Sequence, residues 1–170
     1  DFLYCRIDRR RKLPVTVLLK GLGLNTEEIL NYFYDVEEIT LEADGTYSRE
    51  VNPELLQGQR ANQDVSDPKT GEVIVKKSRK FTRGILAELE KRKIKAIPVA
   101  PEEGVGKVLT TDILHPKTSE VLVEVNNTLT EADIATLREA GVKKVKNVFI
   151  DGVNVGSFLR DTLLIDKVNS

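Results

Sequence analysis

The chain has 170 residues with a formal net charge of −1, and 40% of its residues are hydrophobic, 31% charged and 5% aromatic. That apolar content is enough for one large core or two small ones. The single cysteine, Cys5, excludes an internal disulfide, and no apolar run approaches the roughly 18 residues of a membrane-spanning helix. We therefore expect a cytoplasmic protein with no membrane partner and, since Met is absent even at position 1, a piece of a longer chain.

Although the net charge of the whole chain is close to zero, the chain contains two basic zones. Residues 1–20 hold six basic and two acidic residues, and residues 76–95 hold nine basic residues against two glutamates. The densest run is RIDRRRK, in which Asp8 lies among Arg6, Arg9, Arg10, Arg11 and Lys12. Such a run is either a solvated edge or a surface for a negatively charged partner, and local charge is the better guide to partners than the total.

The first third of the chain predicts a strand and two helices. The alternating, β-prone run at 2–8 indicates a strand. In the run KLPVTVLLKGLG, valine and threonine favour a strand while proline and glycine favour a short helix, and we favour the helix. In NTEEILNYFYD, Asn25 and Glu28 form a capping box ahead of an apolar stripe, so a helix begins there. Residues 37–51 predict two strands around the turn pair Asp44–Gly45.

The middle of the chain contains an internal repeat. Shifting the sequence by 48 residues aligns SDPKTGEVIV with LHPKTSEVLV, and 12 of the 41 pairs from Gly58/Gly106 to Pro98/Lys146 are identical. Chance would give roughly two or three identities, so we predict a duplicated unit. Each copy has a strand, a PKT turn, a second strand, a helix capped by Thr82 or Thr130, and a last strand. Gly141 is expected to end the second helix. We expect an α+β fold with a tandem pair of β-β-α-β modules at 58–98 and 106–146.

The chain has no complete active-site motif. The run DPKTG is too short for a calcium loop and is better interpreted as a hairpin turn, and GVGK lacks the glycine and the Ser/Thr of a phosphate-binding loop. The lone histidine, His115, replaces Asp67 at the repeat turn and lies far in sequence from Cys5. We therefore expect no catalytic residue, no metal site and no cofactor. The basic zone 76–95 indicates a solvated helix face or a surface for nucleic acid or an acidic protein.

The basic run also carries a family resemblance. RIDRRRKLP, within DFLYCRIDRRRKLPVTVLLKGLG and followed by NTEEILNYF, resembles the second lobe of the bacterial RNA polymerase beta subunit. The tail SFLRDTLLIDKVNS resembles the stretch where that lobe resumes, and the repeats between look like its lineage-specific insertion. The resemblance thus implies a lobe segment at 1–35, an insertion at 36–150 and a return to the lobe at 151–170.

The resemblance also implies a function. The whole enzyme is a nucleotidyltransferase that makes RNA from nucleoside triphosphates on a DNA template, with Mg²⁺ bound by the partner subunit, so this fragment alone should be inactive and hold no cofactor. In the family the lobe lines the downstream DNA channel, and the aspartate of RIDRRR, here Asp8, accepts an unstacked guanine of the non-template strand. The neighbouring Arg6, Arg9, Arg10, Arg11 and Lys12 are then expected to attract the DNA backbone. Expected partners are DNA, the other polymerase subunits and, as the alternative function, regulatory proteins of the secondary channel that bind the repeats.

Overall fold

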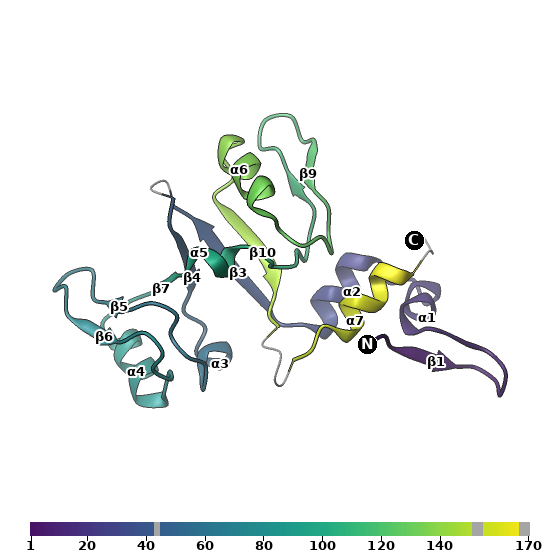
Figure 1. Ribbon diagram of the computed structural model, residues 1–170, viewed down its shortest axis with the longest axis horizontal. Helices are drawn as coiled ribbons and strands as arrows, with labels where there is room; N and C mark the ends of the chain where they lie inside the picture. Colours follow the sequence, from purple (N-terminus) through teal and green to yellow (C-terminus); the bar gives the residue numbers. More distant parts are fainter. Residues whose placement is uncertain (43–44, 151–154, 167–170) are drawn as a thin grey trace. The chain divides into compact units, whose positions relative to one another are not determined.

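The computed structural model describes residues 1–42, 45–150 and 155–166 and combines short helices with antiparallel sheets (Figure 1). This confirms the predicted α+β class. Contacts divide the chain into two compact units, one formed by Asp1–Val36, Val108–Thr128 and Lys146–Ser170, the other by Glu37–Lys107 and Leu129–Val145. Within the described residues, no helix has the length and apolar character needed to cross a lipid bilayer.

The first unit combines two small hairpins with three helices. Its elements are β1 (Tyr4–Arg6), β2 (Lys12–Pro14), α1 (Val15–Gly21), α2 (Thr26–Phe33), β8 (Ile113–Leu114), β9 (Val121–Val123) and α7 (Phe158–Ile165). Seven buried residues form its apolar core: Ile29, Leu30, Tyr34, Val108, Val148, Leu159 and Leu163. Residues near both ends of the sequence thus share one core.

The start of the first unit agrees with the local sequence signals and refines one of them. The expected strand at 2–8 is present but shorter, and the run after Arg11 is strand first and helix second, because Pro14 is extended and caps the helix that begins at Val15. The capping box of α2 is confirmed: Asn25 Oδ1 accepts the Glu28 N–H, and Glu28 Oε2 accepts the Asn25 N–H, both at 2.8 Å.

The second unit is built on a sheet. Strands β3 (Val36–Leu41), β4 (Tyr47–Glu50) and β7 (Ala96–Val99) are neighbours in a four-stranded sheet of order β10-β3-β4-β7, where β10 is Lys144–Val148. β3 and β4 pair antiparallel on either side of Gly45, while Asp44 of the predicted turn lies outside the described residues. The other elements are α3 (Pro53–Leu56), β5 (Val65–Ser66), β6 (Val73–Val75), α4 (Arg83–Lys91), α5 (Pro101–Gly104) and α6 (Glu131–Glu139).

Positions 48 residues apart make the same local contacts. β5, β6 and α4 are matched by β8, β9 and α6 at that spacing, and both hairpins carry a register shift after their first residue pair. Asp64 Oδ1 accepts the Lys77 N–H at 2.6 Å, and Asp112 Oδ1 accepts the Val125 N–H at 2.7 Å. The helix caps predicted at Thr82 and Thr130 are both present. A common set of short-range hydrogen bonds therefore shapes both segments.

Candidate nucleic-acid interface

The basic run folds into a hairpin at the start of the first unit. β1 and β2 pair antiparallel in the register Tyr4↔Pro14, Cys5↔Leu13 and Arg6↔Lys12. The last pair of the ladder is therefore a pair of cations, and the remaining charged residues of the run lie in the loop that joins them. All six predicted site residues are thus brought together in one hairpin: Arg6, Asp8, Arg9, Arg10, Arg11 and Lys12.

Asp8 shapes the loop of this hairpin. Its Oδ1 accepts the backbone N–H of Arg10 at 2.7 Å and that of Arg11 at 2.8 Å. An aspartate that accepts backbone N–H groups two and three residues ahead forms an Asx-type turn, which replaces the ladder bonds that a loop lacks. One carboxylate oxygen is therefore engaged inside the loop, and any base contact by Asp8 has to rely on Oδ2.

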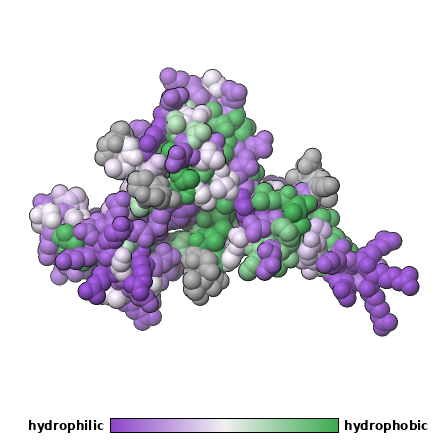
Figure 2. All heavy atoms as spheres, viewed as in Figure 1, coloured by the Kyte–Doolittle hydropathy of each residue, from purple (hydrophilic) through white to green (hydrophobic). Residues whose placement is uncertain are grey.

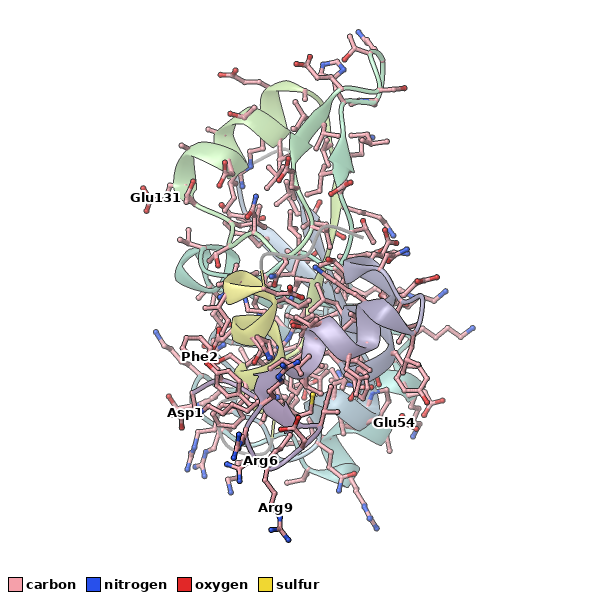
Figure 3. All side chains as sticks on the ribbon, turned by 90° about the vertical axis from the view of Figure 1, so that its right-hand side faces the viewer. Asp1, Phe2, Arg6, Arg9, Glu54 and Glu131 are labelled. Atoms are coloured by element: carbon pink, nitrogen blue, oxygen red, sulfur yellow. The ribbon has the colours of Figure 1, made fainter. Side chains whose placement is uncertain are left out.

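The cations of the hairpin face solvent. Arg6, Arg9, Arg10, Arg11 and Lys12 are all exposed, and none of them belongs to any of the ion pairs found among the described residues. Figure 2 shows this end of the first unit as almost uniformly hydrophilic, and Figure 3 shows Arg9 pointing away from the fold. Lys12 Nζ also lies 4.4 Å from the centroid of the Tyr4 ring. The guanidinium groups are consequently available to an anionic partner.

The hairpin is held by the far end of the chain. The Leu3 N–H donates to Thr162 Oγ1 of α7 at 2.8 Å, and the Val15 N–H donates to the Leu3 carbonyl at 3.0 Å. Thr162 is fully buried, and its Oγ1 also donates to the Phe158 carbonyl at 2.6 Å. Sequence reasoning missed Thr162, because a threonine inside a helix carries no local signal of a partner 159 residues away.

The arrangement suits electrostatic binding of an anionic partner. Closely spaced guanidinium groups on a turn match a repeating phosphate backbone, since each arginine can donate two parallel hydrogen bonds to one phosphate. No group of three or more His, Cys, Asp or Glu residues that could hold a metal ion occurs in the part of the chain that the structure describes.

The whole chain aligns with several curated proteins. It is 58% identical over 170 residues to the DNA-directed RNA polymerase subunit beta of Citrifermentans bemidjiense, and 57% identical over 170 residues to that of a Geobacter species. The protein of the same name from Sorangium cellulosum is 50% identical over 171 residues. Each match covers all of this chain, which spans 12% of the length of these relatives. No family model matches the chain.

Proposed function

Because this chain belongs to the family of DNA-directed RNA polymerase beta subunits, we propose that it is a segment of such a subunit whose first hairpin contacts DNA. In this proposal 1–35 and 151–170 are parts of one lobe beside the downstream DNA, and 36–150 is an insertion in it. Residues 151–154 and 167–170 of the last segment lie outside the described residues. The observation that carries the proposal is the exposed hairpin, whose five cations take part in none of the ion pairs found among the described residues.

The hairpin would act through phosphate contacts. Each cation that neutralises a phosphate releases a condensed counterion, so affinity falls with salt by a slope of about 0.7 per contact on single-stranded DNA. Such contacts position a strand but carry no sequence information. Arg9, Arg10 and Arg11, which follow one another in the loop, are the residues we assign to this contact.

Asp8 would add a preference for one base. Its Oδ2 can accept a hydrogen bond from the N1–H or the amino group on the Watson–Crick edge of an unstacked guanine. Since Oδ1 is engaged by the Arg10 and Arg11 N–H groups, we expect discrimination near the lower end of the range for base contacts, about 1 kcal/mol.

Catalysis in this proposal belongs to the whole enzyme. A DNA-directed RNA polymerase transfers nucleotidyl groups in the cytoplasm together with its other subunits, and Mg²⁺ would be held outside this segment. The segment would contribute DNA positioning and would be inactive alone. Its contribution to the chemistry is therefore indirect, through the path of the DNA.

Salt-dependent binding of single-stranded DNA tests the proposal. The chain and a variant that combines Arg9→Ala, Arg10→Ala and Arg11→Ala are titrated with a labelled oligonucleotide by fluorescence anisotropy at several salt concentrations. We expect the variant to lose about 2 units of the log–log salt slope. The matched control combines Arg83→Ala, Lys91→Ala and Lys95→Ala, three exposed cations of the second unit, and should keep the slope. Equal slopes for the chain and the hairpin variant would refute the DNA contact.

A reassembled polymerase tests the base contact separately. With Asp8→Ala in the full beta subunit, the preference for guanine at one non-template position should fall about fivefold, which corresponds to about 1 kcal/mol. An unchanged guanine preference would remove Asp8 from the proposed contact.

A further inference from the structure

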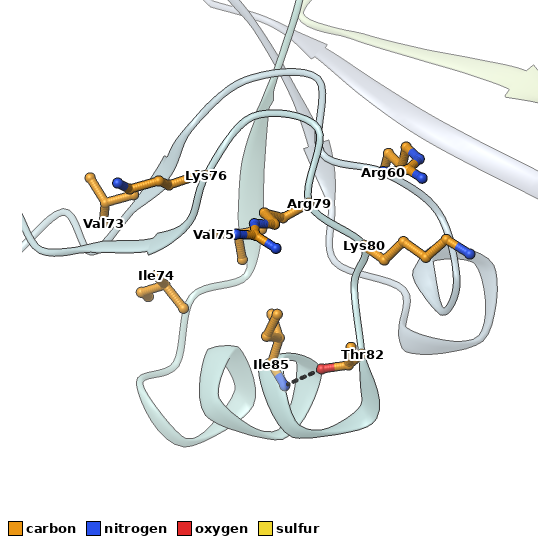
Figure 4. Close-up of a pocket in the computed structure, with 9 residues that line it drawn as sticks. All are labelled: Arg60, Val73, Ile74, Val75, Lys76, Arg79, Lys80, Thr82 and Ile85. Atoms are coloured by element: carbon orange, nitrogen blue, oxygen red, sulfur yellow. Dashed lines mark hydrogen bonds between the residues drawn. The ribbon is translucent and has the colours of Figure 1, made fainter.

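The first repeat, residues 58–98, carries an open hollow of about 610 Å³ (Figure 4). Its floor contains Val73, Ile74 and Ile85, and Val73 is 43% exposed. Its rim contains four cations and no carboxylate: Arg60, Lys76, Arg79 and Lys80. The hollow therefore combines an apolar floor with a positively charged rim.

The positive charge of the rim is not balanced by any ion pair found among the described residues. The four rim cations are exposed, and none takes part in an ion pair within residues 1–42, 45–150 and 155–166. Arg60 Nη1 donates to the Ser78 carbonyl at 2.8 Å, which fixes its direction without neutralising it. Clustered like charges raise the local potential and favour a ligand of opposite sign.

The second repeat shows that the fold does not require these cations. At the positions 48 residues later stand neutral or acidic residues: Val108, Glu124, Asn127 and Thr128. Ile85 of the floor is replaced by Asp133, while the strand residue Val73 is matched by another valine. The local backbone hydrogen bonds are retained, so the charge of the rim and the apolar side chain at position 85 are properties of the first copy alone.

In the second repeat, the edge that contains Val108, Asn126 and Thr128 is in contact with helix α7. Arg160 of α7 donates to the Asn126 carbonyl at 3.2 Å and to Thr128 Oγ1 at 2.6 Å. Val108 is buried in the same apolar cluster as Leu159 of α7. One edge of this copy is therefore covered by an amphipathic helix of its own chain.

The corresponding edge of the first repeat is exposed. Arg60, Ser78 and Lys80 occupy the positions of Val108, Asn126 and Thr128, and all three are exposed. We propose that this edge and the hollow beside it bind an acidic amphipathic helix of a protein partner. Carboxylates on the helix would meet the rim cations, and its apolar side chains would cover Val73 and Ile74, as in other helix-in-groove complexes. This proposal does not depend on the DNA contact of the hairpin.

The chemistry of the hollow favours a helix over nucleic acid. Single-stranded nucleic acid is generally held by cations together with aromatic rings on which bases stack, and no aromatic residue lines the hollow. A phosphate backbone would also leave the apolar floor in water, whereas an amphipathic helix covers both parts. The positively charged rim and the apolar floor together therefore favour a protein ligand over nucleic acid.

A designed peptide tests the proposal. The probe is a fluorescein-labelled helix of about 15 residues with glutamate on one face and leucine on the other. The test variant combines Lys76→Glu, Arg79→Asn and Lys80→Thr, the residues that the second repeat carries. The control combines Arg83→Glu, Lys91→Asn and Lys95→Thr, which changes the net charge equally at exposed positions outside the hollow. We expect at least tenfold weaker binding for the test variant and less than a twofold change for the control.

A second variant tests the floor. Ile85→Asp introduces the residue of the second repeat at the third helical position, where Asp133 completes a capping box with Thr130. The helix start is therefore preserved while the floor loses the apolar side chain of Ile85, and peptide binding should fall at least fivefold. Circular dichroism checks that each variant is folded.

Four outcomes would overturn the proposal: no binding of the peptide to the unmodified chain, equal losses in the test and control variants, unchanged binding to Ile85→Asp, or a larger loss for a mixed-sequence oligonucleotide than for the peptide in the test variant. The last outcome would assign the hollow to nucleic acid. The hairpin variant Arg9→Ala, Arg10→Ala, Arg11→Ala should bind the peptide as the unmodified chain does. Failure of one proposal is thereby separated from failure of the other.

Discussion

Asp8 and Arg11 are joined by a hydrogen bond of 2.8 Å in which the backbone N–H of Arg11 donates to the Asp8 carboxylate, and the Arg10 N–H donates to the same oxygen at 2.7 Å. The single acidic residue of the basic run therefore holds the loop on which the arginines stand. Its negative charge also lowers the mutual repulsion of the cations around it. Asp8 therefore helps to position the arginines of the loop, whether or not it also contacts a base.

Replacing Asp8 separates its role as an acceptor from its charge. In Asp8→Ala the Arg10 and Arg11 N–H groups lose their acceptor, and we expect their amide hydrogen exchange to accelerate about fivefold, equivalent to about 1 kcal/mol. In Asp8→Asn the side-chain oxygen remains, so exchange should stay within about twofold of the unmodified chain. Exchange is measured by NMR. Equal acceleration in both variants would show that charge, and not hydrogen bonding, holds the loop.

Local signals in the sequence were sufficient to predict where three of the helices begin. Asn25, Thr82 and Thr130 cap the helices that they were expected to cap, because a capping side chain and the backbone N–H that donates to it lie within three residues of each other. The strand after Arg11 was missed for the opposite reason, because its cause is not local. Lys12–Pro14 is a strand because it pairs with Tyr4–Arg6, and that pairing is not visible in the propensities of either segment.

Long-range relationships lay beyond sequence reasoning. The anchoring of the hairpin by Thr162 and the contact of Arg160 with Thr128 join residues that are separated by 159 and 32 positions. The charge of the hairpin was evident from composition, but the engagement of Asp8 Oδ1 within its own loop depends on backbone geometry. The hollow of the first repeat required both the fold and the comparison of the two copies.

Glu37 gives the second unit a predictable pH dependence. It is buried, with Oε1 3.1 Å from Arg49 Nη1 and Oε2 3.0 Å from Lys107 Nζ. Burial raises the pKa of this carboxyl, but the charges of Lys107 and Arg49 outweigh burial and hold the pKa below its ordinary value. The folded state therefore binds the proton less readily than the unfolded state. This contribution to stability is complete above the ordinary glutamate pKa and is lost as the pH falls through the lowered pKa of the folded state.

The variant Glu37→Gln tests this contribution. At pH 7 we expect its free energy of unfolding to be about 2 kcal/mol lower than that of the unmodified chain, because two charge-assisted hydrogen bonds are weakened. At a pH near 3 the difference should shrink, since the glutamate is then largely protonated in the unfolded chain. Urea denaturation at both pH values measures it. Glu38→Gln, which affects only the more exposed pair with Lys144, is the control. A difference that does not depend on pH would contradict the assigned pKa direction.

Tyr34 links α2 to the segment that leads into α7. Its hydroxyl donates to the Gly156 carbonyl and accepts the Arg160 N–H, each at 3.2 Å, and burial raises its pKa. Tyr34→Phe leaves both backbone groups without this partner, so we expect a loss of about 1 kcal/mol in the free energy of unfolding. Tyr32→Phe is the control, since that side chain is 79% exposed and should change stability by less than about 0.5 kcal/mol. Equal effects of the two substitutions would show that the buried hydroxyl has no structural role.

The two repeat helices end in the same motif with different residues at the position that needs a left-handed backbone. After α4, Lys93 has φ +57°, its N–H donates to the Glu90 carbonyl, and the Ile94 N–H donates to the Leu89 carbonyl. After α6, Gly141 has φ +81°, with the equivalent bonds from Gly141 to Arg138 and from Val142 to Leu137. This is the Schellman arrangement, in which glycine is favoured because a side chain is strained there.

Exchanging the residues at this position should shift stability in opposite directions. Lys93→Gly should raise the free energy of unfolding by about 0.5–1 kcal/mol, and Gly141→Lys should lower it by about 1 kcal/mol, because only the backbone strain changes. Space is not limiting at Gly141, where no atom lies within 4 Å of an added Cβ. Lys91→Gly, two positions earlier at the last residue of α4, is the control and should be destabilising by up to about 1 kcal/mol, as glycine is within a helix. Thermal unfolding measures all three, and destabilisation by Lys93→Gly as large as that of Lys91→Gly would show that the position after α4 does not hold the left-handed conformation in solution.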